Sequence, residues 1–449
     1  MNVQVRARFD DCLDLDQIRA RVTVRPQPLI ELSGIDPLIA AELMEESLKN
    51  IYVPNKFSLS FIKEMLGRAS LHNADLFKSE TEYVSRVYNP PEVEKFPVCL
   101  TGLAGIGKSQ TIAALRKVCP PAMDFNCSHF EGAIELISHW YVSARGKSSG
   151  KQLLLDVVLG DLEAGKKTNV AKLLVESRRR ANLYGVSLAM LDETQHITGS
   201  GASKVTDILL TMAAIGLPVI FVSNYSLVHK LIRRNSEDKQ RLLSEPRIML
   251  PDHPESQDWK DYVSECIRVC NGQIQVETND LIIELYRSTF GIKRLAVQLL
   301  KLAYIECRSA GRESIKLADI NKAYKSSAYS SNSKEVEELN LQSLQPRTTG
   351  IHLDLRCPFD LPIDRNSNVL NFAREDRDNR VNAAVFDSSL NEKERMAMKH
   401  IGLLPGDVAR SSKQVRRPPV PKVSDEEMTK SFLEIVDSLK PTSKPNKPR

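Results

Sequence analysis

The strongest constraint on this chain of 449 residues is the run GLAGIGKS at residues 102–109. Glycines stand at its first and sixth positions and it ends in Lys-Ser, so it matches the phosphate-binding pattern G-x-x-x-x-G-K-[ST]. The apolar residues 96–101 precede it, and residues 110–118 carry apolar side chains at helical spacing. The context therefore predicts a strand, a loop and a helix.

This loop predicts a nucleotide site that takes ATP with Mg²⁺. Glycines let the backbone curl, so that successive N–H groups face the phosphates at the positive end of the following helix. Lys108 adds a charge on the same oxygens, and Ser109 offers a hydroxyl to Mg²⁺. The predicted nucleotide-binding residues are Gly102, Gly105, Ile106, Gly107, Lys108, Ser109 and Gln110.

A carboxylate pair follows a second apolar run about eighty residues later. Residues 186–191 are apolar and lead into Asp192 and Glu193. Ligands of parallel sheets lie at the carboxyl ends of the strands, so we expect Asp192 to share the Mg²⁺ site with Ser109 and Glu193 to deprotonate the attacking water. The alternative is an exposed Asp-Glu pair that opens a helix at Thr194, where carboxylates favour the helix dipole.

Apolar strands alternate with helical stretches from residue 97 to residue 251, which predicts a parallel α/β sheet covered by helices. A strand at residues 217–222 ends in Ser-Asn. If it lies between the phosphate-loop strand and the Asp-Glu strand, Asn224 stands beside the γ-phosphate and holds the attacking water. The alternative is an Asn in a turn at the end of a strand.

Composition sets wider limits. The net charge of +5 permits nucleic-acid binding without requiring it. The eight cysteines form no C-x-x-C pair, and Cys127 with His129 lacks a second pair of ligands nearby in the sequence, so we expect neither a disulfide framework nor a metal site there. The sequence has no run of eighteen apolar residues and no signal-peptide core, which predicts a cytoplasmic protein without a membrane partner.

The pattern divides the chain into four parts. Residues 1–55 form an N-terminal appendage, residues 56–255 the α/β nucleotide-binding domain, and residues 256–330 a small all-helical domain. From residue 331 the periodicity weakens, and we expect a largely extended tail. Residues 425–439 have a capping-box start and one apolar stripe, which predicts a short amphipathic docking helix, although it could equally fold back on its own domain.

This order of parts resembles the AAA+ ATPases. Residues 102–109 look like their Walker A motif, residues 188–193 like Walker B, Asn224 like the first sensor and residues 291–294 like the second sensor on a helical lid. The resemblance implies that Arg294 touches the γ-phosphate. It also implies an arginine that reaches the nucleotide of the neighbouring subunit, and the position favours Arg241, with Arg233 and Arg234 behind it. The alternative for all three is a solvated basic helix face.

A narrower resemblance is to the TnsC/TniB transposition regulators, carried by residues 52–54, 191–196, 220–226 and 237–242. Thr194 departs from the Ala that such proteins often carry. The resemblance implies a bacterial, ATP-dependent homo-oligomer, a ring or a helix on double-stranded target DNA. It also implies that transposase subunits bind the C-terminal tail and that a target-selector protein binds the N-terminal region.

Basic, glycine-containing stretches lie between residues 145 and 180. Small cationic loops suit contacts to DNA phosphates, which give affinity without sequence information. The alternative is a set of solvated helix ends. The predicted DNA contacts are Lys147, Lys151, Lys166 and Thr168.

Three other functions fit parts of the pattern. A replication initiator or helicase loader shares the ATPase motifs, but we then expect a winged-helix module after the lid. A scaffold that binds ATP and hardly hydrolyses it conflicts with the intact Glu193. A metabolic P-loop kinase leaves the lid and the tail unexplained.

Overall fold

The computed structural model describes residues 3–30, 32–147, 149–158, 169–197, 202–344, 352–360 and 363–394. Contacts divide the chain into a large unit, residues 1–384, and a small unit, residues 385–449. The large unit holds the predicted nucleotide-site residues. In the part of the chain that the structure describes, no helix combines the length and the apolar character needed to cross a membrane.

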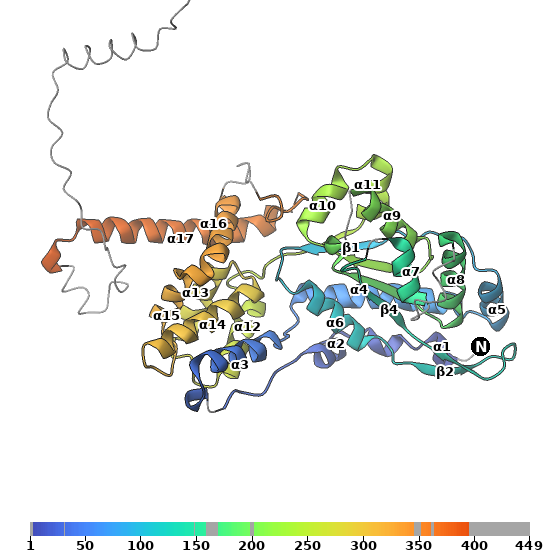
Figure 1. Cartoon of the computed structure of the whole chain (residues 1–449), viewed down its shortest axis with the longest axis horizontal. Helices are drawn as coiled ribbons and strands as arrows, with labels where there is room; N and C mark the ends of the chain where they lie inside the picture. The colour runs from blue at the N-terminus through green and yellow to red at the C-terminus, as the bar shows by residue number, and fades with distance from the viewer. Residues whose placement is uncertain are drawn as a thin grey trace, which may run out of the picture. The chain divides into compact units, whose positions relative to one another are not determined.

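A five-stranded parallel sheet forms the centre of the α/β part of the large unit, beside the helical lid (Figure 1). Its order is β4-β5-β6-β1-β7, and each neighbouring pair is parallel. Every residue of β1, β5 and β6 is buried, as expected for parallel strands covered on both faces. The strands are β1 (Val98–Gly102), β4 (His139–Ser143), β5 (Leu188–Asp192), β6 (Val219–Val222) and β7 (Pro246–Met249).

Alternate residues of each central strand enter different apolar cores, because successive side chains of a strand point to opposite faces. Leu188 and Met190 belong to a core with α2, α4 and α6, whereas Ala189 and Leu191 belong to a core with α7 to α11. The sheet is therefore sandwiched between two helical layers. The helices of this part are α1 (Val3–Arg6), α2 (Leu15–Val22), α4 (Lys56–Leu76), α5 (Glu80–Tyr88), α6 (Lys108–Val118), α7 (Gly150–Val158), α8 (Val170–Leu183), α9 (Ala202–Ala213), α10 (Tyr225–Ile232) and α11 (Ser236–Leu243).

The stretch after α6 differs from the prediction. Strand β2 (Met123–Asn126) pairs with β3 (Ala133–Leu136) in a separate antiparallel hairpin, and β4 follows directly, so strands do not simply alternate with helices here. As an edge strand, β4 buries only Trp140 and Val142 and leaves Tyr141 exposed. Such a short alternation is a weak strand signal beside the long apolar runs of β1 and β5.

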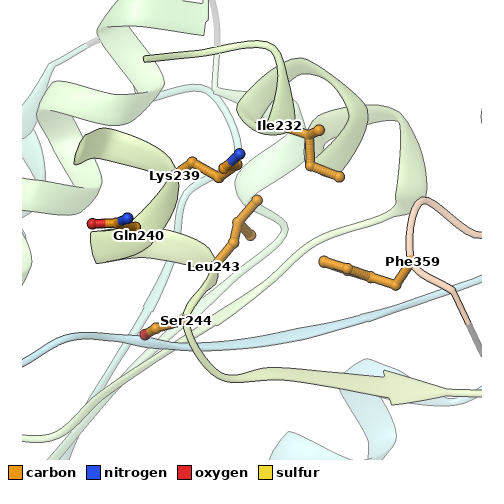
Figure 2. A pocket seen from close by; sticks show the side chains of 6 residues that line it. All are labelled: Ile232, Lys239, Gln240, Leu243, Ser244 and Phe359. Atoms are coloured by element: carbon orange, nitrogen blue, oxygen red, sulfur yellow. The ribbon is translucent and has the colours of Figure 1, made fainter. Parts of the chain in front are cut away.

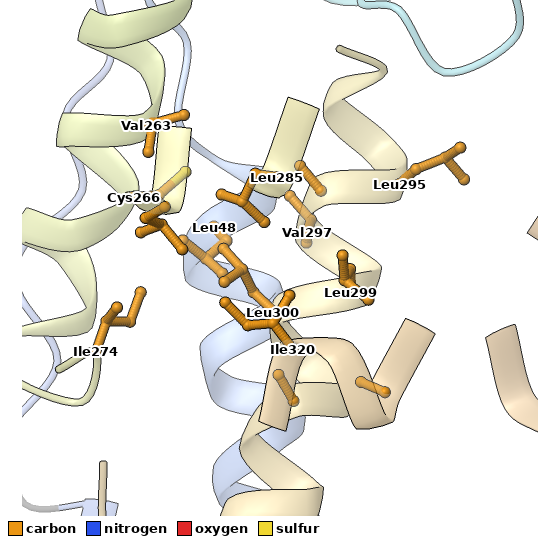
Figure 3. Packing of buried hydrophobic residues seen from close by; sticks show 14 of the residues in the cluster. Leu48, Val263, Cys266, Ile274, Leu285, Leu295, Val297, Leu299, Leu300 and Ile320 are labelled. Atoms are coloured by element: carbon orange, nitrogen blue, oxygen red, sulfur yellow. The ribbon is translucent and has the colours of Figure 1, made fainter. Parts of the chain in front are cut away.

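The helical lid packs around an apolar core that Figure 3 shows from close by. Its helices are α12 (Gln257–Cys270), α13 (Thr278–Thr289), α14 (Lys293–Ser309), α15 (Leu317–Tyr324) and α16 (Ser330–Leu344). The described part of the chain also has four 3₁₀ turns, η1 (Asp10–Cys12), η2 (Leu32–Gly34), η3 (Thr194–His196) and η4 (Ser327–Tyr329). Leu48, from the N-terminal helix α3 (Pro37–Lys49), lies in the same core as Leu285 and Leu300. Helix α3 is thus part of the lid's packing.

The N-terminal segment contributes to both halves of the large unit. Ile18 and Val22 of α2 pack beside Val98 and Leu100 under the sheet, while α3 lies along α14. Lys301 of α14 also bonds two carboxylates of α3, at 2.5 and 2.6 Å. The predicted boundary at residue 55 therefore separates segments that share their cores.

The tail contains more helix than the sequence suggests. Helices α16 and α17 (Ile363–Ser389) lie where extended chain was expected. Phe372 of α17 meets Tyr286 edge-on at 5.1 Å between ring centroids, and Arg287 pairs with Asp376 at 2.5 Å. These contacts with α13 explain why a charged run becomes helical. The predicted docking helix at residues 425–439 lies outside the described residues.

Candidate nucleotide site

The phosphate loop joins β1 to α6 through glycines that the backbone requires. Gly105 and Gly107 have φ values of 79° and 112°, in the left-handed region that favours glycine. A Cβ atom on Gly102 would overlap the carbonyl oxygen of Met249 on the neighbouring strand. The loop ends at Lys108, the first residue of α6, so it leads directly into the positive end of that helix, where phosphates bind favourably.

Lys108 is buried over the loop without a carboxylate bonded to it. Its Nζ donates to the carbonyl oxygens of Gly102, at 2.8 Å, and Leu103, at 2.7 Å. Burial lowers the pKa of Lys108 to about 8, Asp192 opposes that shift and Arg294 adds to it. The cation thus rests on neutral acceptors, which anionic phosphate oxygens would readily replace.

Arg294, at the start of α14, lies against the phosphate loop. Its backbone N–H donates to the Gly105 carbonyl at 3.2 Å, and a Cβ atom on Gly105 would stand 2.8 Å from the Arg294 Nε. The lid therefore places the positively charged guanidinium of Arg294 close to the ammonium of Lys108. This position agrees with the expected contact to the γ-phosphate.

The predicted magnesium residues are adjacent. Ser109 Oγ donates to Asp192 Oδ1 at 3.2 Å, which brings the start of α6 to the end of β5. Asp192 is buried, and its Oδ1 also accepts the N–H of Glu193 at 2.7 Å. A hydroxyl beside a carboxylate is an oxygen donor set that suits Mg²⁺ with phosphate oxygens, so these two residues fit the ion.

Glu193 leaves β5 with a strained backbone. Its φ of 55° is in the left-handed region, which costs a non-glycine residue about 1–3 kcal/mol and is typical of functional sites. Glu193 stands at the N-cap of η3, where the alternative of a helix-opening carboxylate places it, but its side chain makes no capping hydrogen bond there. Instead Glu193 Oε2 accepts from Ser143 Oγ at 3.2 Å and pairs with Arg145 Nε at 3.3 Å.

Sequence reasoning missed the partnership of Arg145 with Glu193. Arg145 was expected to be one member of a basic stretch, but β4 was not expected, so nothing brought residue 145 to the end of β5. In the structure β4 pairs with β5, and Ser143 lies opposite Asp192. Arg145, two residues after Ser143, can therefore reach the carboxylate of Glu193.

Asn224 follows β6, which lies between β5 and β1 as predicted. Its Oδ1 accepts the N–H of Leu227 at 3.2 Å and the hydroxyl of Ser226 at 2.7 Å, so it caps α10. The structure thus assigns Asn224 a capping role, which is close to the turn alternative. Its contact with the attacking water remains a prediction.

Arg241 lies on α11, at the surface, with its charge already paired. It contacts Glu237 at 2.9 Å on the same helix and Glu94 at 3.7 Å. Its side chain is 37% exposed, so a neighbouring subunit could reach it. The role in a neighbour's site remains a prediction.

The remaining predicted nucleotide-binding residues lie beside the loop. Ile106 is buried in the core with α6, and Gln110 Nε2 donates to the Lys49 carbonyl at 3.1 Å. Tyr52 OH lies 3.4 Å from the hydroxyl of Thr111, the residue after Gln110. The N-terminal segment therefore lines the same helix as the phosphate loop.

The predicted DNA contacts are only partly described. Lys147 pairs with Asp156 of α7, and Lys151 stands in the first turn of that helix. Lys166 and Thr168 lie outside the described residues. The described basic loop, residues 143–151 without Ser148, follows β4 and adjoins Glu193 through Arg145.

A separate apolar hollow of about 340 Å³ lies beside α10 and α11 (Figure 2). The segment 352–360 closes one side of it, and His229 Nε2 bonds the Arg356 carbonyl oxygen at 2.9 Å. None of the predicted nucleotide-binding residues lines this hollow. Its lining residues are Ile232, Lys239, Gln240, Leu243, Ser244 and Phe359.

Together these features define the class. A parallel sheet between helical layers, a phosphate loop after β1, a carboxylate pair after β5 and a helical lid are the parts of the AAA+ P-loop fold. The predicted fold class is therefore confirmed, including β6 between β5 and β1.

No protein-family model matches the chain, and no curated protein does. Solved structures with some likeness include the Aeropyrum pernix ORC2 protein in ADPNP-ADP complexes, 14% identical over 68% of this chain and 95% of that chain, with a TM-score of 0.38. Drosophila ORC bound to DNA is 14% identical over 86% and 90%, with a TM-score of 0.39. The Thermotoga maritima RuvB Holliday junction branch migration motor is 10% identical over 73% and 94%, with a TM-score of 0.32. Likenesses at this level carry no argument about function.

Proposed function

We propose that this protein is an ATPase that binds ATP with Mg²⁺ at the phosphate loop. The observation that carries the proposal is the convergence of three elements on that loop: Lys108 of α6, Asp192 of β5 and Arg294 of α14. Two of these residues supply positive charge to phosphates, and the third supplies an oxygen ligand next to Ser109. A structural role alone does not explain two cations packed on one glycine loop.

The residues divide the reaction between them. Lys108 and the loop N–H groups hold the phosphate oxygens, and Arg294 neutralises charge on the γ-phosphate from the lid side. Glu193 accepts the proton of the attacking water. Ser109 and Asp192 would hold Mg²⁺, which when bound would neutralise charge on the phosphate oxygens.

The finer function is a regulator of transposition that assembles on double-stranded DNA. Its support is the sequence resemblance to TnsC/TniB proteins, together with the basic loop after β4 that adjoins the catalytic glutamate. In this proposal the chain forms a ring or a helical homo-oligomer, and Arg241 acts on the neighbour's nucleotide. The C-terminal tail binds transposase subunits and the N-terminal region binds a target selector.

One experiment tests both levels. Negative-stain images of the full chain are recorded with and without ATP and a non-specific duplex, while phosphate release is measured on the same samples. Rings or filaments that need both ATP and DNA are expected. Phosphate release without assembly on DNA would support the ATPase proposal and overturn the proposed role as a transposition regulator. Absence of ATP binding would overturn both proposals.

The DNA-binding loops have their own variants. Charge reversal at Lys151 and Lys166 is expected to weaken duplex binding and to flatten its dependence on salt, because each lost phosphate contact removes about one released counterion. Glu46→Lys, which reverses charge at an exposed position of α3, is the control. An unchanged salt slope in the double variant would contradict the proposed contacts.

A further inference from the structure

Three metal-ligating side chains from distant parts of the chain meet beside the β2–β3 hairpin. Glu80 opens α5, while Cys127 and His129 follow β2. Glu80 Oε1 lies 3.2 Å from Cys127 Sγ and 3.5 Å from His129 Nδ1, and the sulfur and the nitrogen are 4.0 Å apart. A third ligand for Cys127 and His129 could not be found from the sequence, because Glu80 stands 47 residues from Cys127.

These spacings match the edges of a tetrahedral zinc site. Zinc binds Cys sulfur at about 2.3 Å and His nitrogen or carboxylate oxygen at about 2.0–2.2 Å, which puts tetrahedral ligands roughly 3.3–3.6 Å apart. The three observed separations, 3.2, 3.5 and 4.0 Å, lie around that range. We infer that Glu80, Cys127 and His129 form a Zn²⁺ site whose fourth ligand is water.

The surroundings of the cluster support a ligand role for the carboxylate. Ser128 donates to Glu80 Oε1 from its backbone N–H at 2.8 Å and from its hydroxyl at 2.5 Å. Outer hydrogen bonds of this kind orient ligating carboxylates in metal sites. The site is reached from solvent on one side, since His129 is exposed and Cys127 is buried.

The ion would join two segments that apolar packing and the hydrogen bonds from Ser128 to Glu80 already hold together. Phe125 of β2 contacts Phe77 and Tyr83, which flank and belong to α5, in an aromatic cluster. A metal bridge from Glu80 to Cys127 would fix the end of the hairpin to the first turn of α5. The thiol gives up its proton to solvent when the sulfur binds Zn²⁺, and no redox change occurs.

A hydrogen-bonded cluster without metal is the competing explanation, because the Cys127 thiol can donate to Glu80. Cobalt separates the two explanations, since Co²⁺ takes the same tetrahedral ligands and shows a thiolate charge-transfer band only when a cysteine sulfur binds it. The full chain is stripped with a chelator and titrated with Co²⁺ and then with Zn²⁺. One tightly bound ion per chain and a charge-transfer band that Zn²⁺ displaces are expected.

Variants assign the ligands. Cys127→Ser abolishes the band, and His129→Ala and Glu80→Gln each weaken metal binding at least tenfold. Glu80→Gln keeps an acceptor for Ser128, so a purely hydrogen-bonded role would leave metal binding unchanged. Cys357→Ser and His352→Ala, at sites away from the cluster, keep the band. A wild-type chain that binds no metal, or a band that survives Cys127→Ser, would overturn the site, whatever the outcome of the ATPase experiment.

Discussion

The phosphate loop and the basic loop after β4 both follow carboxyl ends of parallel strands, yet they hold their cations differently. At the phosphate loop, Lys108 rests on two carbonyl oxygens. At the β4 loop, Arg145 pairs with Glu193 and Lys147 pairs with Asp156. The first loop thus presents a charge that no bonded carboxylate balances, and the second presents charges that carboxylates already balance.

The difference indicates what each loop can do. A phosphate that enters the first loop replaces neutral carbonyls, so binding gains nearly the full attraction of the cation. A phosphate that approaches the β4 loop must compete with Glu193 for Arg145. The second contact is weaker, but it changes the surroundings of Glu193, the proposed base. Five predictions test this comparison.

The largest effect is expected at Glu193, the carboxylate that Arg145 of the β4 loop contacts. Glu193→Gln removes the base that accepts the proton of water, and such groups contribute about 10²–10⁴-fold to turnover. Phosphate release is expected to fall by that factor while ATP binding is kept. Glu46→Gln, at an exposed site of α3, is the control; normal turnover in Glu193→Gln would rule out its role as base.

Removal of the unbalanced cation comes next. Lys108→Ala deletes a charged hydrogen-bond donor worth about 1.5–3 kcal/mol, so ATP affinity is expected to fall about ten- to a hundred-fold. Isothermal titration with a non-hydrolysable ATP analogue measures it. Lys117→Ala, on the exposed side of the same helix, is expected to bind normally. Unchanged affinity in Lys108→Ala would refute the phosphate-loop assignment.

The burial of Lys108 also predicts a pH dependence. Its pKa is lowered to about 8 from 10.5, mainly by burial, so the empty site loses its proton as pH rises through about 8. ATP binds the charged form, and its affinity is expected to be constant below that pH and to weaken above it, by at most about tenfold per pH unit.

Folding stability responds with the opposite sign in the nucleotide-free chain. Between about 8 and 10.5 the unfolded state holds the Lys108 proton that the folded state has lost, so this residue makes stability rise with pH in that window. Urea unfolding of the wild type and of Lys108→Met, compared across this pH window, isolates the contribution of Lys108 to the pH dependence of stability. Identical pH profiles would contradict the lowered pKa.

The smallest effect is expected at the balanced cation. Arg145 is 66% exposed, and an exposed ion pair is worth about 0.2–1 kcal/mol. Arg145→Ala releases Glu193, so phosphate release without DNA is expected to rise by at most about fivefold, and any stimulation by DNA to shrink. Arg179→Ala, at a comparably exposed pair on α8, is the control. A fall in turnover would mean that Arg145 positions Glu193 productively.

Sequence patterns predicted the parts of the site that local chemistry encodes. The glycines and Lys108 lie in one loop, and the apolar run before Asp192 is long enough to indicate a buried strand. The partners of Glu193 and of Cys127 could not be predicted from the sequence, because each contact joins residues that are distant in sequence and meet only in the folded chain. Arg145 needed β4, a short edge strand, and Glu80 needed the hairpin to meet α5. Helix α17 was not predicted because Phe372 and Asp376 are stabilised by contacts with residues of α13, which is distant in the sequence.

The N-terminal segment has a practical consequence for any shortened version of this protein. Residues 3–22 cover one face of the sheet, residues 32–49 cover the lid, and Leu29 between them bonds the Val269 carbonyl at 2.9 Å. A chain trimmed at residue 55 would expose two apolar surfaces at once and would tend to aggregate. The N-terminal segment thus ties the sheet and the lid together through their apolar cores.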